Sequence, residues 1–124
     1  MKITIPFKTP TLNHLYWHRG NMKIMKREAK ELREKINNIV SKINNDLNND
    51  SKLKVLVEIY ENWFNKDNTI KRIDVLNREK FLIDSIFNSI GIDDKNIFDC
   101  QFIKKQSNKE QSIITINTIE DNQL

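Results

Sequence analysis

The sequence predicts an α+β fold in which a small mixed β-sheet packs against two long helices. Apolar residues recur at helical spacing in residues 26–47 and again in residues 74–90. Apolar and polar residues alternate in residues 2–7 and 52–64, as they do in strands with one buried face. We therefore expect the element order β-loop-α-β-α-β-β, in a single domain that spans residues 1–124.

The first third of the chain is predicted to contain a strand, a long loop and a helix. Ile3, Ile5 and Phe7 alternate with polar residues and would share one face of the strand. Residues 8–21 have the Thr, Asn, Pro and Gly content of a loop, and loops of this length in compact domains tend to be functional or mobile. The helix that follows would end before the turn residues 48–51.

The second helix carries polar residues on one side and apolar residues on the other. Its expected buried face consists of Val75, Leu82, Ile83, Ile86, Phe87 and Ile90. The opposite side of the helical wheel holds Asp74, Asn77, Lys80, Phe81 and Asp84. Gly91 ends the helix, and two further strands, through residues 98–102 and 114–116, would complete the sheet.

Charge and composition narrow the partners of this chain. A net charge of +4 and a pI near 9.2 favour a polyanionic partner such as DNA, although an ordinary protein with surplus lysine would look similar. No apolar run is long enough to span a bilayer, so we expect no membrane contact and a cytoplasmic location. The single cysteine, Cys100, cannot form an internal disulfide, which agrees with a reducing compartment.

Three charged elements around the second helix point to metal-dependent chemistry. Asp74 stands at the helix start, Asp93 and Asp94 follow its end, and Lys80 lies between them in sequence. Mg²⁺ prefers carboxylate oxygens and water, and a neighbouring lysine offsets phosphate charge in a transition state. This set suits metal-assisted phosphodiester hydrolysis. The simpler alternative is that Asp74 caps the helix and the polar arc is only a solvated face.

Residues 71–84 (KRIDVLNREKFLID) and 91–94 (GIDD) resemble the motif of the RusA family of Holliday junction resolvases. That motif is Asp-x-Asp-Asn, then a Lys three residues on, an Asp four residues later, and an Asp-Asp pair about ten further. The segment 10–17 (PTLNHLYW) is similar to the opening of the family, so the resemblance covers nearly the whole chain.

The resemblance implies catalytic roles for Asp74, Lys80 and Asp94, and a metal site made by Asp74, Asp94 and Asp93. Leu76 stands where the family has a second catalytic Asp, and leucine cannot ligate a metal. Three outcomes stay open: another acid such as Asp93, Asp84 or Glu58 replaces it, the site works with fewer carboxylates, or this chain binds junctions without cutting them.

The resemblance also implies the substrate, the cofactor and the assembly. The expected function is a structure-selective endodeoxyribonuclease that resolves Holliday junctions and related branched DNA in recombination and repair. Its cofactor would be Mg²⁺, with Mn²⁺ as a substitute and no organic cofactor. A homodimer would supply two active sites for paired cuts in opposed strands. The alternative is a dimeric junction-binding protein with impaired cleavage, because Leu76 replaces a catalytic Asp.

Several polar and basic residues would hold the DNA backbone. The expected DNA-binding residues are Asn13, Arg19, Lys23, Lys71, Arg72, Asn77 and Arg78. For the basic residues near the first helix, a solvated helix start is an equal alternative, whereas phosphate contact is favoured for those flanking Asp74. Tyr16 and Trp17 could stack on an unpaired base or seal the core under the loop.

Overall fold

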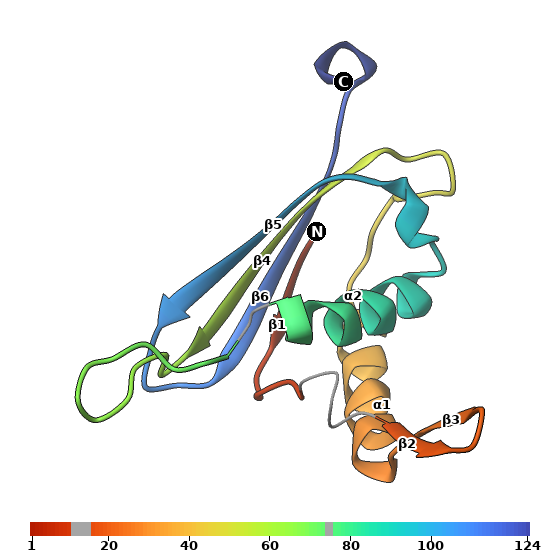
Figure 1. Ribbon diagram of the computed structural model, residues 1–124. Coiled ribbons are helices and arrows are strands. Elements are labelled where there is room, and N and C mark those ends of the chain that lie inside the picture. The colour runs from red at the N-terminus through yellow and green to blue at the C-terminus, as the bar shows by residue number, and fades with distance from the viewer. Residues whose placement is uncertain (11–15, 74–75) are drawn as a thin grey trace.

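The structure is a computed structural model that describes residues 1–10, 16–73 and 76–124, and for residues 76, 77 and 79 it describes the backbone alone. Two helices, α1 (Arg27–Ser41) and α2 (Leu76–Ile90), pack against each other and cover one face of a four-stranded sheet (Figure 1). Neither helix is long and apolar enough to cross a membrane, among the residues described. The predicted α+β class is confirmed.

The sheet has the strand order β1-β6-β4-β5. Its strands are β1 (Lys2–Ile5), β4 (Leu53–Glu61), β5 (Ile97–Gln106) and β6 (Gln111–Thr118). β4 pairs parallel with β5 and antiparallel with β6, which confirms the mixed sheet. α2 connects the parallel strands β4 and β5, which need a long crossover connection. Residues 107–110 then link β5 to β6, which lies on the other side of β4.

The core lies between the sheet and the helices. The burial of β4 alternates strictly, with Leu53, Val55, Val57 and Ile59 facing the helices. Phe81, which the helical wheel placed on the polar side of α2, is instead 2% exposed. The prediction failed because α2 packs against both the sheet and α1, so its buried arc is wider than a stripe that faces the sheet alone.

The segment expected to be a loop contains a small separate sheet. β2 (Tyr16–Arg19) pairs antiparallel with β3 (Met22–Met25), and Gly20 takes the left-handed conformation, with φ of 60°, that such a tight turn requires. α1 also ends earlier than predicted, at Ser41. Ile43 and Leu47 still pack against the core. Their apolar spacing therefore made the predicted helix too long, although the chain is no longer helical there.

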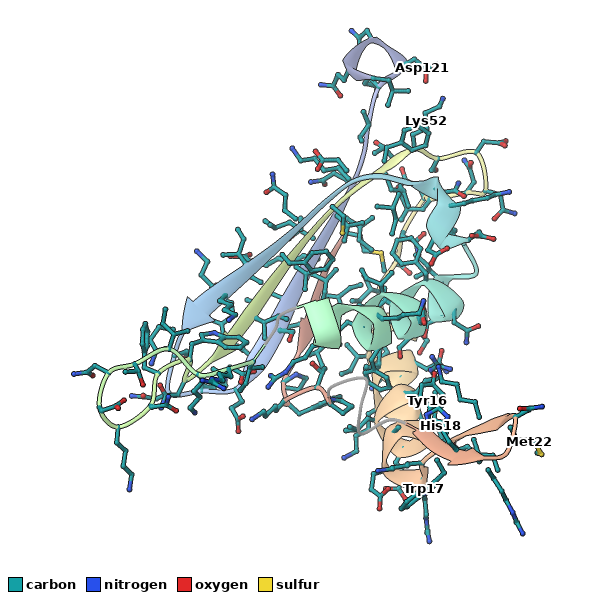
Figure 2. All side chains as sticks on the ribbon, in the orientation of Figure 1. Tyr16, Trp17, His18, Met22, Lys52 and Asp121 are labelled. Carbon is teal, nitrogen blue, oxygen red and sulfur yellow. The ribbon has the colours of Figure 1, made fainter. Side chains whose placement is uncertain are left out.

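The C-terminal segment forms a short 3-10 helix, η3 (Asp121–Gln123). Lys52 donates to the Asp121 carboxylate at 2.5 Å, and Figure 2 labels both residues. The backbone N–H of Ile119 also donates to the carbonyl of Lys52, so two contacts hold this segment beside the start of β4.

Candidate active site

Lys80 and Asp84 of α2 lie beside Asp94, the first residue of the 3-10 helix η2 (Asp94–Asn96). Together with Cys100 and Phe102 of β5 they line one depression, which we call the acid groove. Lys80 and Asp84 share a helix face because they are four residues apart, and their Nζ and Oδ2 atoms are 3.5 Å apart. Lys80 is mostly exposed and Asp84 about one-third exposed, so the groove is open to solvent.

The end of α2 determines where Asp94 lies. Gly91 adopts a φ of 73°, and the N–H groups of Gly91 and Ile92 both donate to the carbonyl of Phe87. This left-handed cap ends the helix and reverses the chain. Asp94 consequently lies near Asp84, and both carboxylates line the acid groove and a second depression next to it.

The second depression brings in residues from the N-terminal half of the chain. Its lining consists of Tyr16, Arg33, Asp84, Phe87, Asn88, Ile92 and Asp94. Arg33 extends from α1, and its Nε donates to the hydroxyl of Ser85 on α2 at 3.3 Å. No pattern in the sequence pointed to Arg33, because the acids beside it, Asp84 and Asp94, are more than 50 positions away along the chain. It adds a cation beside the two carboxylates.

The Asp93–Asp94 pair divides into two roles. Asp93 is the N-cap of η2, and its Oδ1 accepts from the N–H of Lys95 at 2.9 Å. This hydrogen bond lowers the pKa of the Asp93 carboxyl below its ordinary value, because it favours the ionised form. Of the two acids, only Asp94 lines the grooves, so its position fits the predicted catalytic role better.

The other end of α2 lies partly outside the described residues. Two of the predicted site residues, Asp74 and Asn13, lie outside the described residues, as do the side chains of Leu76 and Asn77. Leu76 is the first residue of α2, and the helix rises about 21 Å from there to Ile90. Asp94 follows that far end. Within the part of the chain that the structure describes, no three His, Cys, Asp or Glu residues form a group suited to a metal ion.

Arg78 does not lie where the sequence predicted. Its side chain is 2% exposed, and its Nη1 is paired with the carboxylate of Glu61, which is 4% exposed at the end of β4. The guanidinium also lies over the ring of Trp63, at 5.5 Å from the ring centre. The structure therefore gives no support to the predicted phosphate contact of Arg78, because its charge is neutralised inside the protein and away from solvent.

Glu58 is also removed from the acidic cluster. It follows Val57 on β4, so it points to the face of the sheet that carries no helix. There its Oε2 lies 3.8 Å from Nζ of Lys105 on β5. Of the acids considered as replacements for the Asp missing at position 76, Asp84 is the one that lines the acid groove together with Asp94.

The remaining basic residues are placed at the surface. Arg19 and Lys23 are exposed on the β2–β3 hairpin, and Arg72 is exposed just before α2. Lys71 is half-buried, and its backbone N–H donates to the carbonyl of Trp63 at 2.9 Å. These positions leave the four cations available to a polyanion, so their DNA contacts stay a prediction.

Comparison with known proteins identifies the family of this chain. The family model described as Endodeoxyribonuclease RusA matches residues 6–117. A search of curated proteins found no significant match. Because the family model covers nearly all of the chain, from before the hairpin into the last strand, this protein belongs to the RusA family of endodeoxyribonucleases, the Holliday junction resolvases.

Proposed function

We propose that this chain resolves four-way junctions and related branched DNA by Mg²⁺-dependent hydrolysis, in recombination and repair, with Mn²⁺ able to substitute. The observation that supports this most is the acid groove, where the motif lysine, Lys80, lies beside Asp84 and Asp94. The three residues come from two elements and reach one solvent-open site, where a phosphate of DNA can enter.

The donor set fits a hard divalent cation. Asp84 and Asp94 offer carboxylate oxygens in a partly exposed groove, and Mg²⁺ is usually held by one or two carboxylates together with waters and substrate phosphate. Asp74 would complete the set, as the family motif implies. When bound, the cation supplies an activated water and neutralises charge on the phosphate.

Lys80 has a separate task in this proposal. Its ammonium is exposed and 3.5 Å from Asp84, so it can move from the carboxylate to a phosphate oxygen without being freed from a buried pair. There it would offset the negative charge that develops as the P–O bond breaks. Asp93 would act indirectly, since its cap on η2 holds the backbone next to Asp94.

A homodimer is part of the proposal, because resolution requires paired cuts in opposed strands. Each copy would supply one acid groove with its own Lys80, Asp84 and Asp94, so two copies would provide one site for each of the two strands to be cut.

The direct test is nicking of an end-labelled synthetic four-way junction in EDTA, Mg²⁺ or Mn²⁺. We expect cuts only with metal, in symmetric pairs, and little cutting of a duplex with the same sequence. Asp94→Asn should bind the junction as the parent does and should not cut it, since an amide keeps the shape but loses the charge that holds the cation. Cutting by Asp94→Asn at the parental rate would refute the metal assignment.

Leu76 favours a second candidate, a junction-binding protein with impaired cleavage. A Mg²⁺ titration of the parent and of Leu76→Asp separates the two functions. If the parent is a nuclease with one fewer carboxylate, it cuts at high metal, prefers Mn²⁺, and Leu76→Asp lowers the metal concentration for half-maximal cleavage. If the parent never cuts but Leu76→Asp does, the natural protein is the binding module.

A further inference from the structure

The β2–β3 hairpin presents an apolar outer face that nothing in the described chain covers. Trp17 pairs across the strands with Ile24, and Arg19 pairs with Met22, so these four side chains share one face. Trp17 and Met22 are each 63% exposed and Ile24 is 39% exposed. We call this set the hairpin outer face. Figure 2 shows Met22 at the hairpin tip and Trp17 on the side away from α2.

The opposite face of the hairpin attaches it to the body of the protein. Tyr16 and Met25 are paired across the strands, and both pack against the core. Tyr16 also lines the depression that contains Asp84 and Asp94. Trp17 of the hairpin outer face therefore directly follows a residue that lines the depression with the acids of the candidate active site.

The charge of this segment favours an anionic partner. Residues 16–26 contain Arg19, Lys23 and Lys26 and no acidic residue. Nζ of Lys26 lies 4.5 Å from the centre of the Trp17 ring, and Nζ of Lys23 lies 4.1 Å from that of Tyr16. Lys26 occupies one side of the indole, which leaves the other side to solvent and puts a cation next to any group that stacks there.

An aromatic ring with flanking cations matches the chemistry of a single-stranded nucleotide. A base can stack on the indole while its phosphate contacts a nearby lysine or arginine, and such stacking does not depend on the base. We propose that the hairpin outer face binds an unpaired nucleotide of branched DNA, with its base stacked on Trp17 and its phosphates near Arg19 and Lys26. The branched substrate rests on the proposed function, whereas the stacking itself needs no metal and no cleavage.

Tryptophan fluorescence tests the contact in EDTA, where no cleavage occurs. The chain has two tryptophans, and Trp63 is 3% exposed, so a collisional quencher or a stacked base reaches Trp17 alone. A short oligothymidylate and a four-way junction serve as probes. Both should quench the emission on binding. Trp17→Phe keeps a ring and should retain most of the affinity without the quenching, and Trp17→Ala should bind oligothymidylate about tenfold more weakly.

Phe64→Ala is the matched control, because Phe64 is also an exposed aromatic, 40% exposed. It follows β4, and this strand ends on the side of the sheet away from the hairpin (Figure 1). This variant should bind as the parent does, and the emission of buried Trp63 reports that each variant is folded. Parental affinity in Trp17→Ala, or binding without quenching, would overturn the inference. So would a blue shift of Trp17 emission with protein concentration that DNA does not reverse, because a second copy would then cover this face. Quenching in a protein that never cuts junctions would support the contact and refute only the nuclease.

Discussion

Two ion pairs on α2 show how differently one helix uses its charges. Arg78 and Glu61 are paired in the interior, with side chains 2% and 4% exposed. Lys80 and Asp84, beginning only two residues later, are paired at the surface, with side chains 59% and 32% exposed. The inner pair joins α2 to the end of β4, whereas the outer pair lies in the acid groove.

The difference concerns what each cation can do. The guanidinium of Arg78 contacts the Glu61 carboxylate and lies over the ring of Trp63, so its charge is neutralised within the protein. Its Nε is buried and has no hydrogen-bond partner among the described residues. The Lys80 ammonium is exposed to water, so exchanging its partner Asp84 for a phosphate oxygen costs little free energy. We therefore interpret the inner pair as an anchor for α2 and the outer pair as part of the reaction site.

The largest expected effect is on stability, from Arg78→Met. This change leaves the Glu61 charge buried without its main partner, and breaking a buried pair from one side typically costs about 3–5 kcal/mol. Lys80→Met should change the free energy of unfolding by less than about 1 kcal/mol, because exposed pairs contribute little. Urea unfolding followed by Trp63 fluorescence measures both.

A double variant sharpens this comparison. Glu61→Met combined with Arg78→Leu removes both charges together, and most of the lost stability should return because no unpaired charge stays buried. If the single and double variants are equally unstable, side-chain packing around Trp63 holds α2 in place and the ion pair does not. Equal losses in Arg78→Met and Lys80→Met would remove the distinction between the two pairs.

The next effect is on cleavage, from Lys80→Met. Loss of a positioned cation at the phosphate should slow junction cutting about 100-fold at saturating Mg²⁺, while junction affinity and the unfolding midpoint stay near those of the parent. Lys42→Met, at an exposed lysine after α1, is the matched control and should cut normally. Parental cutting by Lys80→Met would mean that the outer pair is only a solvated contact.

A smaller effect on DNA binding separates the two arginines near the start of α2. Arg72→Ala should reduce the slope of log affinity against log salt by about one unit, if exposed Arg72 contacts one phosphate. The Glu61→Met, Arg78→Leu double variant should leave that slope unchanged, because the inner pair contacts no DNA. A reduced slope in the double variant would show that Arg78 reaches DNA in the complex after all.

The fold could be predicted from the sequence where one face of an element decides its pattern. The strict alternation in β4 and the apolar arc of α2 follow from burial against a single core, so both elements were found with their approximate ends. The hairpin was missed because Trp17, Met22 and Ile24 are exposed, and its strands therefore carry no inside–outside pattern.

The site could be predicted only as far as its motif is local. Lys80 and Asp94 reach one groove, as their positions in the motif suggested. Arg78 and Arg33 could not be placed, since their partners, Glu61 and Ser85, are 17 and 52 positions away and lie on other elements. A charged residue is expected at the surface unless such a distant partner is known, and a single sequence does not identify the partner.

The smallest expected effect contrasts the two neighbouring acids at η2. The N–H of Lys95 lowers the pKa of Asp93 below its ordinary 3.8, so the ionised carboxylate contributes stability that is fully present above that pH and is lost as the pH falls through the lowered pKa. Asp93→Ala should lower Tm slightly at neutral pH, and the difference from the parent should vanish in acid. Asp93→Asn should keep the cap, because its amide oxygen still accepts, but should lose the pH dependence of that difference. Thermal melts of the three proteins at neutral and acid pH measure this, and a junction assay completes the contrast: Asp93→Asn should retain cutting that Asp94→Asn loses. If Asp93→Asn also loses cutting while its Tm is unchanged, the Asp93 carboxylate binds the metal directly, and the cap is not its main role.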